Sequence, residues 1–306
     1  MTVAIVIACA LAVFAALVLL RRRAIAHPRR PRAVRATPYA QKDLTVLGHR
    51  LRYVDEGSGP PLLLIPGHTS RIEEYDAVAA LLHAHHRVIV FDFPGSGYAD
   101  KPDREYDLGF YENVACLALD ALGIDRCHVA GGSLGGNLAL RLARRWPARF
   151  LRVAAWGPGS AWEAMPFVAA CMRAFHLAGH PLFWLVSRLQ SRYWFSKDWH
   201  GAAANLRETF AYYREVGCPG FIRMYWGIAA DQMGWSLFGI APGIAQPTLL
   251  LWGDRDHGMD MGRGVRRLHA LMPASRLVVF PGAGHALAAE RPAELAAHLI
   301  EFFSRH

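Results

Sequence analysis

The sequence has 306 residues, of which 53% are hydrophobic and 19% are charged, and its formal net charge is +9. This composition excludes a disordered chain, and the length is sufficient for one large domain with a sizeable insertion. Seven arginines within residues 21–35 cause most of the positive excess, because residues 41–306 contain 27 basic and 25 acidic residues. The charge therefore gives no reason to expect a nucleic-acid partner.

Residues 2–20 form an uninterrupted apolar stretch without a single charge. About 20 such residues are what a helix needs to cross a bilayer. Because three arginines follow the stretch and no basic residue precedes it, the distribution of positive charge predicts a single-pass anchor with the rest of the chain in the cytoplasm. We therefore predict a transmembrane anchor over residues 1–23 and a basic linker over residues 24–40 that lies along the anionic membrane surface. The alternative is a secretory signal cleaved at Ala24-Ile25-Ala26.

From about residue 41, short apolar runs alternate with longer segments of helical periodicity. This pattern is typical of the α/β class, in which helices cover both faces of a mostly parallel sheet. We expect the first two strands to form a hairpin and helices to join the later ones. Eight strands are predicted, at residues 44–46, 51–55, 62–65, 87–92, 127–130, 151–155, 248–252 and 277–280. Helices are predicted near residues 71–84, 107–122, 134–145, 262–271 and 292–304.

Between residues 160 and 244 the predicted strands disappear and aromatic residues become frequent. We predict that this segment is a helical insertion into a core formed by residues 41–159 and 245–306. Most of its aromatic side chains are expected to pack against one another, and a minority are candidates for contact with a bound substrate. These aromatic residues are Trp162, Phe167, Phe175, Phe183, Trp184, Tyr193, Trp194, Phe195, Trp199, Tyr212, Tyr213, Tyr225, Trp226 and Trp235.

A candidate nucleophile, Ser133, lies between the strand predicted at residues 127–130 and the helix predicted at residues 134–145. Its surroundings read Gly131-Gly132-Ser133-Leu134-Gly135. Glycines are needed beside the serine because the sharp turn strains its backbone and leaves no room for neighbouring side chains. The positive end of the helix dipole favours negative charge at this position. The motif is weak evidence alone, because five residues arise easily by chance.

A serine hydroxyl becomes a good nucleophile only when a base removes its proton and a carboxylate orients that base. Asp256 follows the strand predicted at residues 248–252, and His285 follows the last predicted strand. Serine, aspartate and histidine in this order, each beyond the carboxyl end of a strand, predict a catalytic triad at one edge of the sheet. The competing acid is Asp254, which can instead be a turn-forming residue.

Acyl transfer also requires hydrogen-bond donors for the oxyanion that develops on the substrate. We expect one donor to be the backbone N–H of Leu134. The second is expected in the loop at residues 66–70, most simply the backbone N–H of His68. The alternative for this loop is an ordinary turn capped by Thr69 or Ser70.

Together these residues resemble a lid-bearing serine hydrolase of the α/β-hydrolase superfamily, from about residue 44 to the end of the chain. Residues 92–102, which read DFPGSGYADKP, resemble the D-x-P-G-x-G-x-S-D loop of that superfamily. In the resemblance, the insertion at residues 160–244 corresponds to the lid. The chain departs from the family pattern at two positions: the usual His-Gly before the oxyanion donor is Pro66-Gly67, and a D-x-x-x-P sequence does not follow Asp256.

The resemblance implies an activity as well as a fold. Haloalkane dehalogenases and epoxide hydrolases on this scaffold attack through aspartate, whereas Ser133 implies an acyl-enzyme. The predicted anchor and aromatic lid are similar to those of membrane-bound monoacylglycerol lipases, which implies a lipid-like ester with an apolar part as substrate.

Two alternatives to ester hydrolysis stay open. The first is hydrolysis of a carbon-carbon bond by the same triad, with cationic side chains binding an acid group of the substrate. The second is a receptor that binds a small molecule without catalysis. Cationic candidates for the first are Arg173, Arg188, Arg192, Arg207, Arg214 and Arg223.

No metal or organic cofactor is expected. His176 and His180 have the i, i+4 spacing that can place two imidazoles on one face of a helix. No glutamate follows His176 and no third ligand is close in sequence, so packing or surface roles are the simpler interpretation. The sequence also contains no phosphate-binding G-x-x-x-x-G-K-[S/T] motif.

Overall fold

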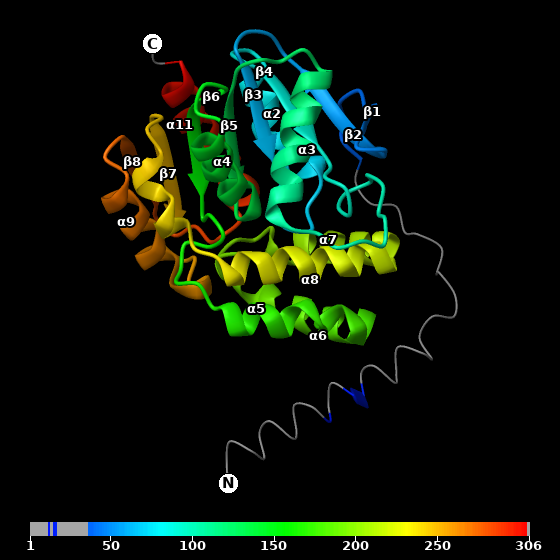
Figure 1. Ribbon diagram of the computed structural model, residues 1–306. Coiled ribbons are helices and arrows are strands. Elements are labelled where there is room, and N and C mark those ends of the chain that lie inside the picture. The colour runs from blue at the N-terminus through cyan, green and yellow to red at the C-terminus, as the bar shows by residue number, and fades with distance from the viewer. Residues whose placement is uncertain (1–11, 13–14, 17–35, 305–306) are drawn as a thin grey trace.

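The computed structural model describes residues 12, 15–16 and 36–304, and an eight-stranded sheet forms its centre (Figure 1). The strands lie in the order β1-β2-β4-β3-β5-β6-β7-β8. β1 pairs with β2 and β2 with β4 in antiparallel register, and all the other pairs are parallel. The strands are β1 (Lys42–Val46), β2 (His49–Glu56), β3 (Pro61–Ile65), β4 (Arg87–Phe91), β5 (Cys127–Gly132), β6 (Phe150–Trp156), β7 (Thr248–Gly253) and β8 (Ser275–Phe280).

Helices pack on both faces of this sheet, and Figure 1 shows α3 and α4 in front of it and α2 and α11 behind it. The front face carries α3 (Leu108–Ala121), α4 (Leu134–Arg145) and α9 (Met261–Leu271). The back face carries α2 (Asp76–Leu82), preceded by the short turn η1 (Ile72–Tyr75), together with α10 (Leu287–Glu290) and α11 (Pro292–Phe303). The predicted α/β-hydrolase arrangement of eight strands and flanking helices is therefore confirmed.

Two hydrophobic cores lie on opposite faces of the sheet, because successive side chains of a strand point to opposite sides. In β3, Leu63 and Ile65 belong to the front core, whereas Leu62 and Leu64 belong to the back core. The central strands are buried on both faces and are therefore nearly continuous apolar runs. This burial holds the carboxyl ends of β3, β5, β6 and β7 in fixed relative positions.

The predicted hairpin is present, although its turn lies slightly earlier than expected. Lys42 to Val46 pair with Tyr53 to His49, so only Leu47 and Gly48 connect the two strands. Both residues have positive φ angles, 51° and 75°. Two-residue turns with positive φ match the right-handed twist of paired strands. The sequence Gly48-His49-Arg50 is therefore mostly strand rather than turn.

Helices connect β6 to β7 and form a layer below the carboxyl edge of the sheet, with α8 between the sheet and the pair α5 and α6 (Figure 1). Phe183 is fully buried in this layer, and its ring contacts Tyr213, Phe221 and Tyr225 at centroid distances of 5.2, 5.4 and 4.9 Å. The aromatic residues thus pack largely against one another. The elements are α5 (Pro166–Arg173), η2 (Phe175–Ala178), α6 (Gly179–Gln190), η3 (Ser191–Tyr193), α7 (Ala202–Val216), α8 (Pro219–Gly234), η4 (Leu237–Gly239) and η5 (Ala241–Gly243).

The prediction of a single-pass, membrane-anchored chain requires correction. Within the residues that the structure describes, no helix combines the length and the apolar character needed to cross a membrane. The prediction rested on the hydropathy and flanking charges of residues 2–20, which apart from residues 12 and 15–16 lie outside the described part, as do residues 21–35 of the basic segment.

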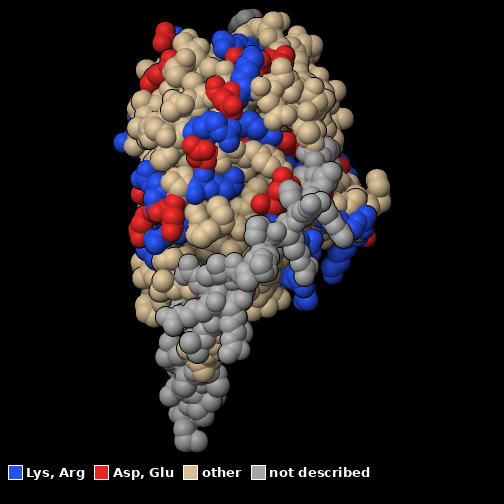
Figure 2. All heavy atoms as spheres, turned by 90° about the vertical axis from the view of Figure 1, so that its right-hand side faces the viewer, with Lys and Arg blue, Asp and Glu red and all other residues tan. Residues whose placement is uncertain are grey.

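The surface of the described chain carries charges of both signs. On the face that Figure 2 presents, basic and acidic side chains lie intermingled rather than in a patch of one sign. Side chains of opposite sign also form ion pairs at the surface, such as Arg50 with Asp43, at 2.8 Å, and Arg223 with Asp103, at 2.7 Å. The distribution agrees with the near balance of basic and acidic residues after residue 40.

Candidate active site

Ser133 occupies the sharp turn between β5 and α4. Its φ and ψ angles are 55° and −118°, a combination that side-chain-bearing residues rarely adopt. The turn needs its glycines, because a Cβ atom at Gly135 would lie 1.9 Å from the carbonyl oxygen of Ile65 and one at Gly131 would lie 2.6 Å from the backbone of Gly135. The Ser133 N–H donates to the Trp156 carbonyl at 2.9 Å, which fastens the turn to the end of β6.

His285 and Asp256 form a hydrogen-bonded pair, with 2.6 Å between His285 Nδ1 and Asp256 Oδ2. Asp256 is buried, with a relative exposure of 2%. Gly157, the residue after Trp156, lies against the pair: a Cβ atom there would be 3.0 Å from His285 Nδ1 and 3.2 Å from Asp256 Oδ2. The structure thus brings Ser133, Asp256 and His285 to the same edge of the sheet. No hydrogen bond joins Ser133 to His285 in the described residues, and such bonds often tighten only when substrate binds.

The competing acid, Asp254, has a different role. Its Oδ1 atom accepts a hydrogen bond from the Gly282 N–H at 2.7 Å, and its side chain is 40% exposed. Asp254 therefore stabilises the loop that leads to His285, whereas Asp256 is the carboxylate that touches the imidazole.

Two further carboxylates, half-buried Glu74 and buried Glu290, act on His285, and the sequence offered no signal for either. Burial lowers the pKa of His285, but Asp256 and, more weakly, Glu74 and Glu290 raise it, so that the pKa lies above its usual 6.5. The imidazolium is consequently favoured in this site. Glu74 follows another glutamate in a short turn, and Glu290 ends a four-residue helix; in the sequence both resemble ordinary surface charges.

Glu74 forms a hydrogen bond with the loop that is predicted to supply an oxyanion donor. Its Oε2 atom accepts the N–H of Gly67 at 2.9 Å, and the Ser70 N–H donates to the Gly67 carbonyl at 3.1 Å. Among the described residues, neither His68 nor Leu134 donates its backbone N–H to a hydrogen bond, so both donors are available. The loop lies close to the serine turn, since a Cβ atom at Gly67 would be 3.8 Å from the Gly132 carbonyl oxygen.

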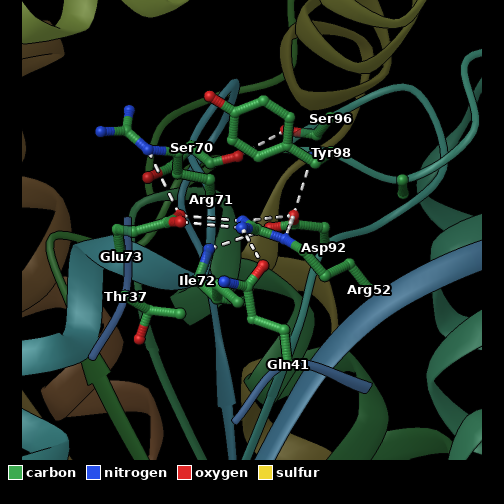
Figure 3. Close-up of polar contacts among 12 residues, drawn as sticks. Thr37, Gln41, Arg52, Ser70, Arg71, Ile72, Glu73, Asp92, Ser96 and Tyr98 are labelled. Carbon is green, nitrogen blue, oxygen red and sulfur yellow. Dashed lines mark hydrogen bonds and ion pairs between the residues drawn. The ribbon is translucent and has the colours of Figure 1, made fainter. Parts of the chain in front are cut away.

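A buried network of charged side chains stabilises the same loop at its end near Ile72 (Figure 3). Arg52 donates from Nε to Asp92 and from both Nη atoms to Glu73, each at 2.8 Å. Asp92 also accepts the backbone N–H of Ile72 at 2.9 Å and that of Tyr98 at 2.7 Å. The network therefore ties the loop after β3 to residues 92–98, the segment that resembles the D-x-P-G-x-G-x-S-D loop.

The helical insertion covers this loop closely. The His68 ring stacks on Tyr225 with 5.0 Å between centroids, and the Thr69 and Tyr213 hydroxyls lie 2.7 Å apart. Burial lowers the pKa of His68 to about 4, so its ring is neutral near pH 7. A cavity of about 10 Å³ lies between Gly67, Leu134 and Met224 and their neighbours. Such a cavity is large enough for one water molecule but not for a substrate.

A wider, open groove of about 540 Å³ runs beside Asp256 and His257. Neither Ser133 nor His285 lines it. The groove therefore does not give access to the serine.

The two histidines considered as metal ligands bind different carbonyl groups. His176 Nδ1 lies 2.7 Å from the Arg173 oxygen, and His180 Nε2 lies 2.6 Å from the Gly217 oxygen. No cluster of three or more potential ligands occurs in the part of the chain that the structure describes. No chemical step is assigned to either imidazole.

The chain is similar in sequence to several known hydrolases. A family model described as alpha/beta hydrolase fold matches residues 60–292. Haloalkane dehalogenase 2 of Mycobacterium tuberculosis (strain ATCC 25618 / H37Rv) is 28% identical over 272 residues, which cover 83% of this chain and 91% of that protein. The 2-hydroxy-6-oxo-6-phenylhexa-2,4-dienoate hydrolase of Burkholderia cepacia is 27% identical over 254 residues, covering 77% of this chain and 85% of that protein.

A solved structure agrees in fold. The crystal structure of the enol-lactonase from Burkholderia xenovorans LB400 superposes with a TM-score of 0.72 at 22% identity, covering 86% of this chain and 100% of that chain. At this identity the likeness concerns the fold alone.

Proposed function

Since the chain belongs to the alpha/beta hydrolase fold family and is a hydrolase of that fold, we propose that it cleaves carboxylic esters with an apolar acyl or alcohol part through an acyl-enzyme on Ser133. The observation that carries the proposal is the 2.6 Å contact between His285 and Asp256 beside the strained serine turn. Serine, a base and an orienting carboxylate are the parts that acyl transfer requires.

In the proposed mechanism, His285 removes the proton from the Ser133 hydroxyl as Oγ attacks the ester carbonyl carbon. Asp256 accepts the Nδ1–H of His285, which leaves Nε2 free to take that proton and stabilises the resulting imidazolium. The negative charge on the carbonyl oxygen is received by the N–H groups of His68 and Leu134, and each such donor lowers the barrier by about 3 kcal/mol.

Collapse of this intermediate releases the alcohol, which takes the proton from His285 and leaves the acyl group on Ser133. A water molecule then attacks the acyl-enzyme while His285 accepts its proton. The carboxylic acid leaves and the serine hydroxyl is restored, so that one ester and one water yield one acid and one alcohol.

We further propose that the helical insertion acts as a lid. Its aromatic side chains lie over the oxyanion loop, and the space beside Leu134 is too small for an ester. In this proposal the insertion moves to admit the substrate, and its aromatic side chains favour an apolar acyl or alcohol part.

A second candidate is hydrolysis of a carbon-carbon bond, which the name of the Burkholderia cepacia relative supports. That reaction would need a cation free to bind the acid group of the substrate. Arg173 and Arg223 in the insertion are instead paired with Asp231 and Asp103, and Arg214 lies over the ring of Trp184. Arg188, Arg192 and Arg207 are exposed on the insertion, so these contacts count against only half of the cationic candidates.

The proposal is tested with p-nitrophenyl esters of graded chain length. Ser133→Ala should lower kcat/KM by at least about 10³-fold, because the attacking oxygen is lost. Ser304→Ala, at an exposed position directly after the last helix, is the matched control and should keep full activity. Wild-type rates with Ser133→Ala on these esters would exclude the mechanism, and turnover of a vinylogous diketone acid without turnover of any ester would favour carbon-carbon cleavage.

A further inference from the structure

The loop that carries His285 is linked to the helical insertion on both sides of the histidine, directly on one side and through Glu290 on the other. Ahead of it, the N–H of Gly284 donates to Glu290 Oε2 at 3.0 Å, and behind it the N–H of Ala286 donates to the carbonyl of Trp194 at 3.0 Å. The other oxygen of Glu290 accepts the N–H of Ser196, from the insertion, at 3.1 Å. One carboxylate therefore holds a residue of the histidine loop and a residue of the insertion together.

The fit around this carboxylate is tight. Glu290 is buried, with a relative exposure of 5%, and a Cβ atom at Gly284 would lie 2.4 Å from Ser196 N and 2.6 Å from Glu290 Oε1. In the described part of the chain no lysine or arginine forms an ion pair with Glu290. Because a buried charge is costly unless it is hydrogen-bonded, the two N–H groups are what keep the carboxylate in place.

We propose that Glu290 is a positioning residue that ties the His285 loop to residues 194–196 of the insertion, so that the base is held ready for proton transfer only while the insertion is docked. This inference rests on the proposed triad. If the insertion moves to admit the substrate, as proposed above, movement of residues 194–196 breaks the bonds to both Glu290 and Ala286. When the insertion docks again after the substrate has entered, these hydrogen bonds re-form and His285 returns to its productive position.

Glu290 also bears on the charge of the base. The carboxylates that face His285 are Asp256, Glu74 and Glu290, and each of them raises its pKa. A variant at residue 290 that lacks the negative charge should therefore lower the pKa of His285. A role limited to packing would leave that pKa unchanged.

The test compares Glu290→Gln with Glu294→Gln, an exposed glutamate of the next helix. An amide has one acceptor oxygen where two N–H groups need acceptors, so one donor is left unpaired. With the best p-nitrophenyl ester, Glu290→Gln should lower kcat about tenfold or more, with less effect on KM. It should also move the acid limb of the kcat/KM profile to lower pH.

Glu290→Asp keeps the charge, so its acid limb should stay in place while kcat still falls. A Glu290→Gln profile identical to that of Glu294→Gln would overturn the inference.

Amide hydrogen exchange of the wild-type protein tests the same link without a variant. If the insertion and the histidine loop open together, the amides of Ser196, Gly284 and Ala286 should exchange at one common rate, faster than those of β7. Exchange of Gly284 and Ala286 at the rate of β7, with Ser196 exchanging independently, contradicts the inference. This measurement does not depend on activity, so failure of the proposed ester hydrolysis and failure of the Glu290 link can be told apart.

Discussion

At the scale of single residues, His285 is the side chain on which the proposed chemistry depends. Its imidazole must be neutral to accept the serine proton, yet three carboxylates favour its charged form. Since the pKa is raised above 6.5, activity should increase with pH through a midpoint above that value and should be lost below it. The same carboxylates stabilise the imidazolium in the transition state, where the positive charge develops.

A substitution of the acid tests its assignment. Asp256→Asn should lower kcat/KM by at least about 10³-fold, because the amide no longer holds the productive tautomer of His285, and the acid limb should move to lower pH as the neighbouring charge disappears. The matched control is Asp254→Asn, two residues earlier, which removes the negative charge near Arg255 but keeps an oxygen that can accept the Gly282 N–H. Equal losses in the two variants would mean that Asp256 has no special role.

At the scale of elements, the strands and most helices could be predicted, because the repeat of apolar residues that marks them lies within consecutive residues. The residues of the triad could be located because each follows a strand whose end is fixed by a buried apolar run. Glu74 and Glu290 could not be recognised, because each sits in a short helical turn and gains its role from backbone N–H groups of other segments of the chain. The same is true of Arg52, which lies in an edge region of the sheet but is 7% exposed.

The buried network around Arg52 yields a prediction about stability. Arg52→Leu leaves Asp92 without the cation that Arg52 supplies and leaves Glu73 with Arg71 alone, at 3.3 Å. Loss of one partner of a buried pair typically costs about 3–5 kcal/mol of unfolding free energy. Arg50→Leu, on the same strand, breaks exposed contacts with Asp43, Asp100 and the Tyr98 carbonyl and should cost about 1 kcal/mol. Urea unfolding of both variants measures the difference, and similar midpoints for the two would show that the network does not stabilise the fold.

At the scale of the whole molecule, two cores and one sheet support a site that the helical insertion covers. The antiparallel hairpin forms one edge of the sheet, and the candidate site lies near its middle, over β3, β5, β6 and β7. Ser133, Asp256, His285 and His68 lie in loops or turns and Leu134 begins a helix, whereas the rigid strands position these segments. This division allows the insertion to move while the ends of the strands stay fixed.

The stability of the whole molecule should depend on pH through its buried histidines. Burial lowers the pKa of both His68 and His128 from 6.5 to about 4. The unfolded chain therefore binds more protons than the folded protein between pH 6.5 and 4, and the free energy of unfolding should fall as pH falls through this window. The slope is at most about 1.4 kcal/mol per pH unit for each such group.

Urea unfolding at pH 7.0 and pH 5.0 measures this loss. His128→Leu should make the loss smaller, because one of the two groups is removed, whereas His257→Leu, at an exposed position, should leave it unchanged. A wild-type protein whose unfolding free energy rises between pH 7.0 and pH 5.0 would contradict the proposed origin of the dependence.

The central claim is that Ser133 is an activated nucleophile in the folded protein, and labelling with a fluorophosphonate tests it most directly. We expect stoichiometric modification that peptide mass spectrometry locates at Ser133, that is abolished in Ser133→Ala and in heat-unfolded protein, and that an excess of an apolar ester slows. Folded protein that stays unlabelled, or that is labelled at another serine, would contradict the account and favour a small-molecule receptor.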